Sequence, residues 1–308
     1  MTTPIPASGE QFVLRHGSAT VKVGAVAAVL REFSVGDLHF TETWEDEVVT
    51  PFGCGIVLSP WPNRVAKGQW VYEGAVQQLD LTEVARNSAL HGLLRNTPYT
   101  ADEVTDTSVT LSAPIFPQHG YPFTLQTSVR YELGPDGLVV THRAVNVGTG
   151  TAPYGIGTHP FLKISSFPTA ELRIASSAAT YVAVDELLIP VSEDPVEGTP
   201  ADLRHGPLVG DLDLDTAYTD LEQVDGEYRA VLTAPDGTEL QMWADPQFGW
   251  QQIFTTDIFP GAGVAVAVEP MTCGIDAFNN GRGLITLAPG ESFEGTWGLR
   301  PVGVDLRA

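Results

Sequence analysis

The sequence predicts an all-β protein, a large antiparallel β-sandwich, from three observations. Runs rich in β-branched and aromatic residues recur along the chain, and several alternate apolar with polar residues, as half-buried strands do. Turn signals separate these runs at hairpin spacing. The 31 glycines and 23 prolines are spread over all 308 residues, which leaves little room for long helices.

Four runs show the strand pattern most clearly. They are Thr124 to Leu133, Gly137 to Asn146, Tyr228 to Pro235 and Glu239 to Asp245. GPDG joins the first two runs and APDG joins the last two, so we expect two hairpins. Many strands joined in this way favour an antiparallel sandwich or barrel. The polar, proline-rich segment Ser192 to Pro207 is expected to be a long loop over the mouth of the sandwich, so residues 1–308 are expected to form one domain.

Composition restricts the partners and the compartment. Asp and Glu total 38 against 16 Lys and Arg, a formal net charge of −22. Such a surface repels phosphate backbones and anionic lipids, so no nucleic-acid or membrane partner is expected. The start MTTPIPASGEQF lacks the features of a signal peptide, and the longest apolar run, Val23 to Leu30, is too short to span a bilayer. We expect a cytoplasmic protein, of open oligomeric state, in which Cys54 and Cys273 are idle thiols; one disulfide between them stays open.

Several cofactor motifs are incomplete. The G-x-G sequences at Gly155 and Gly261 lack the third glycine of a nucleotide-binding turn. Residues 211–222 place carboxylates at calcium-loop positions, but Thr216 stands where that loop needs glycine. The seven histidines form no H-x-H or H-E-x-x-H pair. No metal or other cofactor is expected.

The stretch VAVAVEPMTCG, Val264 to Gly274, carries a carboxylate to the end of an apolar run. Glu269 follows small and β-branched residues, and Pro270 comes next. Because proline has no N–H for a sheet ladder, we expect the strand to stop there and its edge to turn away. Glu269 would then be a base presented by a rigid element, while a solvated surface glutamate is the plainer alternative.

Three other segments hold polar residues in unusual surroundings. SPWPNR places Asn63 and Arg64 after two prolines in an extended segment. NSALHGLLRN places His91 before a glycine, with Arg95 nearby, and YGIGTHPFL places His159 between glycines and a proline. A single histidine in such a place is more typical of a hydrogen-bonded structural residue than of a catalyst.

Taken together, these segments resemble the aldose 1-epimerases, the galactose mutarotases. The resemblance covers nearly the whole chain and rests on blocks in family order: PWPNRVAKGQW, NSALHGL, HGYPFTLQTSVRYEL, DGLVVTHRAVNVGTGTAPYGIGTHPFL, LDTAYTDL, VAVEPMTCGIDAFNNG and LAPGESF. It implies the galactose mutarotase-like supersandwich, with an open sugar-binding cleft, which agrees with the strand pattern. It also implies interconversion of the α and β anomers of a free hexose.

The resemblance implies a role for each matching residue. Glu269 corresponds to the general base and His159 to the general acid. His91 corresponds to a residue that contacts the sugar ring, Arg64 to a substrate-binding residue and Asp215 to one that binds sugar hydroxyls.

Further site assignments come from positions near these blocks. Asn63 and Arg95 are expected to bind substrate, and Tyr121 of HGYP is expected to stack on a sugar face. Asp211 and Asp213 stay open as alternatives to the third aspartate of DLDLD, because residues at a spacing of two share one strand face.

The implied chemistry explains these residue types. Inversion at C1 needs a base at O1 and an acid at the ring oxygen O5, which we expect on opposite sides of one ring. Desolvation raises the pKa of a glutamate, and a neighbouring carboxylate keeps a histidine protonated, so the two pKa values are expected to converge towards neutrality. No metal, nucleotide or covalent intermediate is required.

Three alternatives remain open. HGLLRN departs from the common form of the galactose mutarotase block, so an arginine could bind a hexose 6-phosphate or a sulfonated hexose; Arg95 is the first candidate, with Arg64, Arg86 and Arg282 behind it. A non-catalytic sugar-binding domain is the second alternative. Glycoside hydrolysis by paired carboxylates is the third, and it leaves the histidines without a role.

Overall fold

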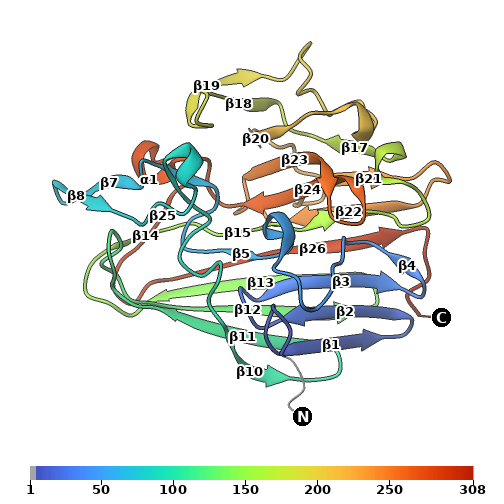
Figure 1. Cartoon of the computed structure of the whole chain (residues 1–308), viewed down its shortest axis with the longest axis horizontal. Coiled ribbons are helices and arrows are strands. Elements are labelled where there is room, and N and C mark those ends of the chain that lie inside the picture. The colour runs from blue at the N-terminus through green and yellow to red at the C-terminus, as the bar shows by residue number, and fades with distance from the viewer. Residues whose placement is uncertain (1–4, 308) are drawn as a thin grey trace.

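The computed structural model describes residues 5–307, so the first four residues of the segment assessed for a signal peptide lie outside it. Figure 1 shows stacked layers of strands with only short helical turns between them. In the described residues the single α-helix is α1 (Ala277–Asn280). The remaining helical pieces are 3-10 turns: η1 (Pro51–Gly53), η2 (Val84–Arg86), η3 (Thr169–Glu171) and η4 (Val209–Asp211). The all-β prediction is confirmed.

One eight-stranded antiparallel sheet contains the four runs predicted from the sequence. In spatial order its strands are β10 (Thr100–Val104), β11 (Ser108–Ile115), β12 (Leu125–Gly134), β13 (Gly137–Asn146), β26 (Ser292–Val302), β22 (Glu239–Ala244), β21 (Tyr228–Thr233) and β17 (Arg173–Ser176). Gly134 pairs with Gly137, so GPDG forms a two-residue hairpin turn as expected. The APDG hairpin joins β21 to β22.

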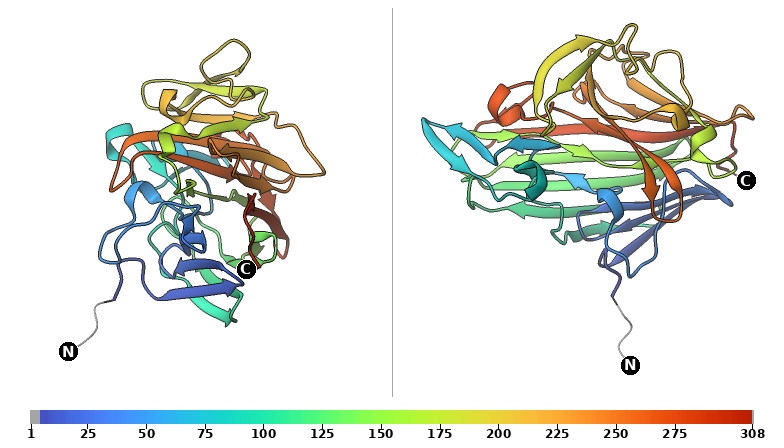
Figure 2. Two further views of the ribbon diagram at one scale, coloured as in Figure 1. Left: turned by 90° about the vertical axis from the view of Figure 1, so that its right-hand side faces the viewer. Right: turned by 45° about the horizontal axis from the view of Figure 1, so that its top comes forward.

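The second large sheet carries the residues of interest. In spatial order it consists of β19 (Pro190–Pro195), β18 (Thr180–Val184), β20 (Asp215–Thr219), β23 (Trp250–Phe259), β24 (Gly263–Met271), β15 (Gly157–Thr158) and β5 (Val57–Leu58), and β16 (Phe161–Leu162) also pairs with β24. Figure 2 shows this sheet stacked over the first one.

Four smaller sheets complete the described fold. They are β1 (Gln11–His16) to β2 (Ala19–Gly24), β3 (Val29–Val35) and β4 (Leu38–His39); β14 (Ala152–Tyr154) with β25 (Ile285–Leu287); β6 (Arg64–Ala66) with β9 (Ser88–Leu90); and β7 (Gln69–Tyr72) with β8 (Ala75–Gln78). No helix in residues 5–307 is long and apolar enough to cross a membrane. Both cysteines are buried and free.

The core lies between the two large sheets. Tyr131 and Trp297 of the first sheet and Ile253 and Val268 of the second are fully buried members of one apolar cluster. Successive side chains of a strand point to opposite faces. Glu269, next to Val268, is therefore on the face of β24 that points away from this core.

Two local predictions are wrong. β24 continues through Pro270 to Met271 and is paired on both sides, so it is an interior strand. The N–H of Val268 donates to the carbonyl of Pro160 (3.1 Å), and by alternation the nitrogen of Pro270 faces the same side, at the break between β15 and β16 where no donor is needed. The segment Ser192 to Pro207 is not a loop throughout, because its start belongs to the edge strand β19, whose polar side chains suit an exposed edge.

Candidate active site

A cavity of about 350 Å³ lies against the second sheet and gathers most of the predicted site residues. Of the eight predicted positions only Tyr121 is missing from its wall. The lining residues are Thr50, Phe52, Gly53, Asn63, Arg64, Leu90, His91, Arg95, His159, Asp215, Gln252, Phe254 and Glu269.

Strand register explains the floor of the cavity. Gln252 of β23 pairs directly with Glu269 of β24, and Asp215 of β20 pairs with Phe254 of β23. Residues 252 and 254 of one strand share a face, so all four side chains emerge on the same side of the sheet. A rigid, hydrogen-bonded platform therefore positions the carboxylates.

Glu269 and His159 are in direct contact. Their Oε1 and Nε2 atoms are 3.3 Å apart, and the two residues are only 1% and 5% exposed. His159 follows β15 and precedes β16, and its ring stacks on Phe161 at a centroid distance of 5.3 Å. The acid and base candidates are thus adjacent, and the expectation that they face each other across a sugar ring is wrong.

Burial dominates the protonation of this pair. Burial raises the pKa of Glu269 well above its usual value, and the nearby Asp215 carboxylate adds to the rise. Burial lowers the pKa of His159 to about 4. The predicted rise for the glutamate is found, but the pKa of the histidine shifts the opposite way, because loss of hydration dominates and the charge of Arg95 lowers it further. The two opposite shifts favour a form of the pair that carries a single proton, on Glu269 rather than on His159.

Two atoms of the pair have no hydrogen-bond partner within residues 5–307. They are Nδ1 of His159 and Oε2 of Glu269, and both are buried. A buried polar atom without a partner typically costs about 1–3 kcal/mol. Both atoms belong to residues that line the cavity, where a bound molecule can reach them.

Hydrogen bonds between Asn63 and His91 fix the tautomer of His91. The N–H of Asn63 donates to Nδ1 of His91 (3.2 Å), and the N–H of His91 donates to the carbonyl of Asn63 (2.9 Å). Both residues have positive φ, 56° and 62°. Burial lowers the pKa of His91 well below its usual value, with added repulsion from His159, Arg95 and Arg64. The neutral ring therefore carries its proton on Nε2 and acts as a donor.

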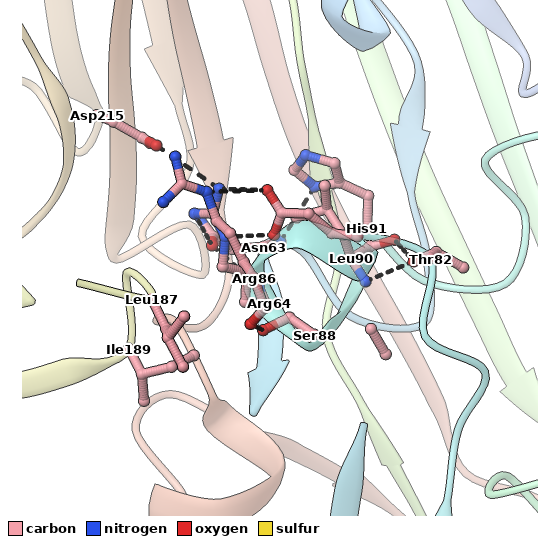
Figure 3. A network of polar contacts seen from close by, with 12 residues as sticks. Asn63, Arg64, Thr82, Arg86, Ser88, Leu90, His91, Leu187, Ile189 and Asp215 are labelled. Atoms are coloured by element: carbon pink, nitrogen blue, oxygen red, sulfur yellow. Dashed lines mark hydrogen bonds and ion pairs between the residues drawn. The ribbon is translucent and has the colours of Figure 1, made fainter. Parts of the chain in front are cut away.

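Arg64 is held in place by two carboxylates (Figure 3). Its Nε and Nη2 donate to Oε2 and Oε1 of Glu83 at 2.7 and 3.1 Å, a bidentate pair. Its Nη2 also lies 3.6 Å from Oδ2 of Asp215. Glu83 also forms an ion pair with Arg86, with 3.3 Å between Oε1 and Nε. Arg86 does not line the cavity.

Gln252 links the two sides of this binding region. Its Nε2 donates to Oδ1 of Asp215 (2.6 Å), and its Oε1 accepts from Nδ2 of Asn63 (3.2 Å). Sequence reasoning missed both Gln252 and Glu83. Neither stands in a distinctive local motif, and only the register of β23 against β24 would have identified Gln252.

The three aspartates of DLDLD separate in the structure. Asp211 ends the turn η4, and Asp213 lines a neighbouring hollow. Asp215 alone lines the cavity. The expected common strand face does not exist, because β20 begins only at Asp215.

Two other predicted residues behave differently from each other. Arg95 lines the cavity, donates from Nη1 to the carbonyl of Leu90 (3.2 Å) and forms no ion pair within the described chain. Tyr121 is fully buried, and its hydroxyl donates to the carbonyl of Pro153 (2.7 Å). The expectation that Tyr121 contacts a sugar is therefore wrong. Its aromatic character serves a core cluster with Phe123 and Phe278.

The remaining arginine candidate is also accounted for. Arg282 stacks over Trp250 and pairs through Nε and Nη2 with Glu193, away from the cavity. Among residues 5–307 no three or more His, Cys, Asp or Glu side chains are grouped as metal ligands would be.

Comparisons with known proteins identify the family. The aldose 1-epimerase family model matches residues 10–300. The chain is 31% identical to the uncharacterized protein YihR of Escherichia coli K12, over 94% of this chain and 92% of that protein. It superposes on a galactose mutarotase-like protein from Clostridium acetobutylicum (TM-score 0.85, 18% identity, 98% of both chains). It also superposes on galactose 1-epimerase from Lactobacillus acidophilus (TM-score 0.79, 19% identity, 94% of this chain and 92% of the other). The chain belongs to the aldose 1-epimerase family.

Proposed function

We propose that the protein is an aldose 1-epimerase that interconverts the α and β anomers of a free hexose. The observation that carries this proposal is the contact between Glu269 and His159, 3.3 Å apart in a cavity lined by sugar-binding residue types. O1 and O5 of a pyranose are bonded to the same carbon, C1. Two adjacent proton-transfer groups on one wall suit that arrangement.

Ring opening needs the single proton of the pair to be on His159. Transfer from Glu269 to Nε2 of His159 across their contact produces a carboxylate and an imidazolium. The carboxylate of Glu269 removes the proton from the O1 hydroxyl as His159 donates its proton to O5. The C1–O5 bond breaks, C1 becomes an aldehyde, and the pair again holds one proton.

Ring closure reverses these roles after rotation about the C1–C2 bond. His159 removes the proton from the O5 hydroxyl, O5 attacks the other face of C1, and Glu269 returns its proton to O1. Each group must therefore act as acid in one half of the cycle and as base in the other, which a pair sharing one proton does without an external donor.

The remaining polar groups would hold the sugar. Asp215 would accept from hydroxyls, Arg64 would donate to them, and the Nε2–H of His91 would donate near the ring. Because Glu83 and Gln252 already hold Arg64 and Asp215, these groups need little reordering when a sugar binds.

Anomer-exchange NMR on a panel of aldoses tests the proposal. We expect the protein to accelerate exchange of glucose or galactose, and Glu269→Gln at equal concentration to remove most of that acceleration. If a folded wild-type protein binds these sugars without accelerating exchange, it is the non-catalytic binding domain instead.

One observation favours a second candidate, an epimerase for an anionic hexose. Arg95 lines the cavity without an ion pair in the described chain, and its Nε has no hydrogen-bond partner there. Burial lowers its pKa and the charge of Glu83 offsets this only in part, so a bound anion would stabilise the guanidinium further. Glucose 6-phosphate and sulfoquinovose belong in the same panel. Acceleration of an anionic sugar alone, lost in Arg95→Met, would replace the neutral hexose as substrate.

A further inference from the structure

A second hollow adjoins the catalytic cavity. Its volume is about 620 Å³, and its wall contains Val209, Gly210, Leu212 and Asp213 together with the ends of β23 and β24 that meet at their hairpin. The two spaces share Phe52 and Phe254. They are therefore neighbours separated by an aromatic wall.

The two spaces follow each other along one strand direction. On β23, Gln252 lines the cavity, Phe254 lines both spaces and Thr256 lines the hollow. These three residues alternate by two and so share a sheet face. The same order holds on the neighbouring segment. Asp213, two residues before β20, lines the hollow, and Asp215, the first residue of β20, lines the cavity. The cavity and the hollow thus lie in line along the sheet, from the reacting pair to the β23–β24 hairpin, and we call this line of two compartments the groove.

Phe52 divides this groove. Its ring lies 6.1 Å from that of Phe254, 6.4 Å from Phe161 and 6.0 Å from Phe259, and the residue is still 41% exposed. Its φ of 51° is in the left-handed region, which disfavours bulky side chains. The aromatic contacts therefore keep the Phe52 ring over the groove, although the backbone conformation of this residue is unfavourable for a bulky side chain.

The chemistry of the hollow suits a sugar unit. Thr256 offers a hydroxyl, Asp213 and Asp257 offer carboxylates, and Phe254 offers an aromatic ring. Apolar walls with a few convergent polar groups are typical of small-ligand sites. A hexose whose reducing end is at Glu269 could extend into this space only if the Phe52 ring did not separate the two compartments.

We propose that Phe52 is a specificity-determining residue that limits the substrate to a single hexose. Its ring separates a hexose-sized cavity from a hollow that would otherwise hold the second unit of a reducing disaccharide. This inference rests on the proposed epimerase function and adds the feature that sets substrate size.

The first test measures anomer exchange of glucose, maltose and gentiobiose by NMR with wild type and Phe52→Gly. Glycine removes the ring and adopts positive φ without strain. We expect the ratio of disaccharide to glucose kcat/KM to rise about tenfold or more for at least one disaccharide, a change worth roughly one interaction of moderate strength. Phe116→Gly, a 64% exposed phenylalanine that lines neither space, is the matched control and should leave the ratio unchanged.

The second test refills the hollow. Adding Asp213→Trp to Phe52→Gly should return the ratio to the wild-type value, whereas adding Asp211→Trp, an equal change two residues earlier and outside both spaces, should not. An unchanged ratio in folded Phe52→Gly, or a gain that Asp213→Trp leaves intact, overturns the proposal. Wild type that accelerates no sugar would refute the epimerase function itself, while normal glucose exchange with an unchanged ratio refutes only the role of Phe52.

Discussion

The two halves of the proposed catalytic cavity, a binding half and a reacting half, are built in opposite ways. In the binding half, Arg64, Asn63, Gln252 and Asp215 are hydrogen-bonded to one another or to Glu83. In the reacting half, the side chains of His159 and Glu269 contact each other through one polar atom each, and their other side-chain polar atoms have no partner among residues 5–307. Satisfied groups fix geometry, whereas unsatisfied buried groups keep their capacity for proton transfer.

The largest kinetic effect is expected from Glu269→Gln, which tests the contrast between the two halves. The substitution keeps the shape but removes the ionisable proton carrier, so we expect kcat/KM to fall by about a hundredfold to ten-thousandfold with KM little changed. Steady-state exchange rates by NMR measure it. A loss of less than about threefold would move the acid–base role away from the reacting half.

The pH dependence of kcat/KM sharpens the same contrast. The active pair holds one proton, gains a second as pH falls through the pKa of His159, about 4, and loses its only proton as pH rises through the raised pKa of Glu269. We therefore expect an acid limb near pH 4 and an alkaline limb above the usual range of a glutamate. The alkaline limb should disappear from the residual activity of Glu269→Gln, and its persistence there would assign it to another group.

The three aspartates of DLDLD should differ in how strongly their substitution raises KM. Asp215→Asn removes a charge that faces Arg64 and weakens an acceptor, so KM should rise roughly tenfold to a hundredfold. Asp211→Asn and Asp213→Asn should change KM by no more than about twofold, since neither lines the cavity. Equal effects from all three would mean that net charge, rather than contact, controls affinity.

A smaller effect is expected when the support of Arg64 is weakened. Glu83→Gln keeps the side-chain shape but replaces a bidentate carboxylate, so Arg64 should become less ordered and KM should rise about tenfold at nearly constant kcat. Glu222→Gln is the matched control, because Glu222 is exposed and does not line the cavity. A fall in kcat alone would place Glu83 with the reacting half.

The smallest kinetic effect should come from Tyr121→Phe. Losing the hydrogen bond to the Pro153 carbonyl should lower the free energy of unfolding by about 1 kcal/mol, measured by urea denaturation, with exchange kinetics unchanged. A rise in KM without loss of stability would return Tyr121 to the binding site.

The sequence predicted elements better than it predicted their surroundings. Alternation and turn residues identified β12, β13, β21 and β22 to within about two residues, because those signals are local. Pro270 was misread as a stop because its tolerance depends on the gap between β15 and β16, which no local pattern reports. That residues 1–308 form one domain stays a prediction.

The predictions for the site succeeded and failed for the same reason. Motif blocks and positions beside them led to seven cavity residues, since those residues occur in or near distinctive local sequence. Gln252 and Glu83 were invisible because their importance comes from pairings with residues far along the chain, Gln252 with Glu269 and Glu83 with Arg64. Tyr121 was misplaced for the converse reason, because a conspicuous block says nothing about which way a ring points.

The interior position of β24 has a consequence for how this protein can diverge. Its reacting carboxylate is secured by neighbouring strands on both sides, whereas Phe52 and His91 come from connecting segments that tolerate replacement more readily. Substrate preference can therefore drift through changes in those segments while the reacting carboxylate is inherited intact.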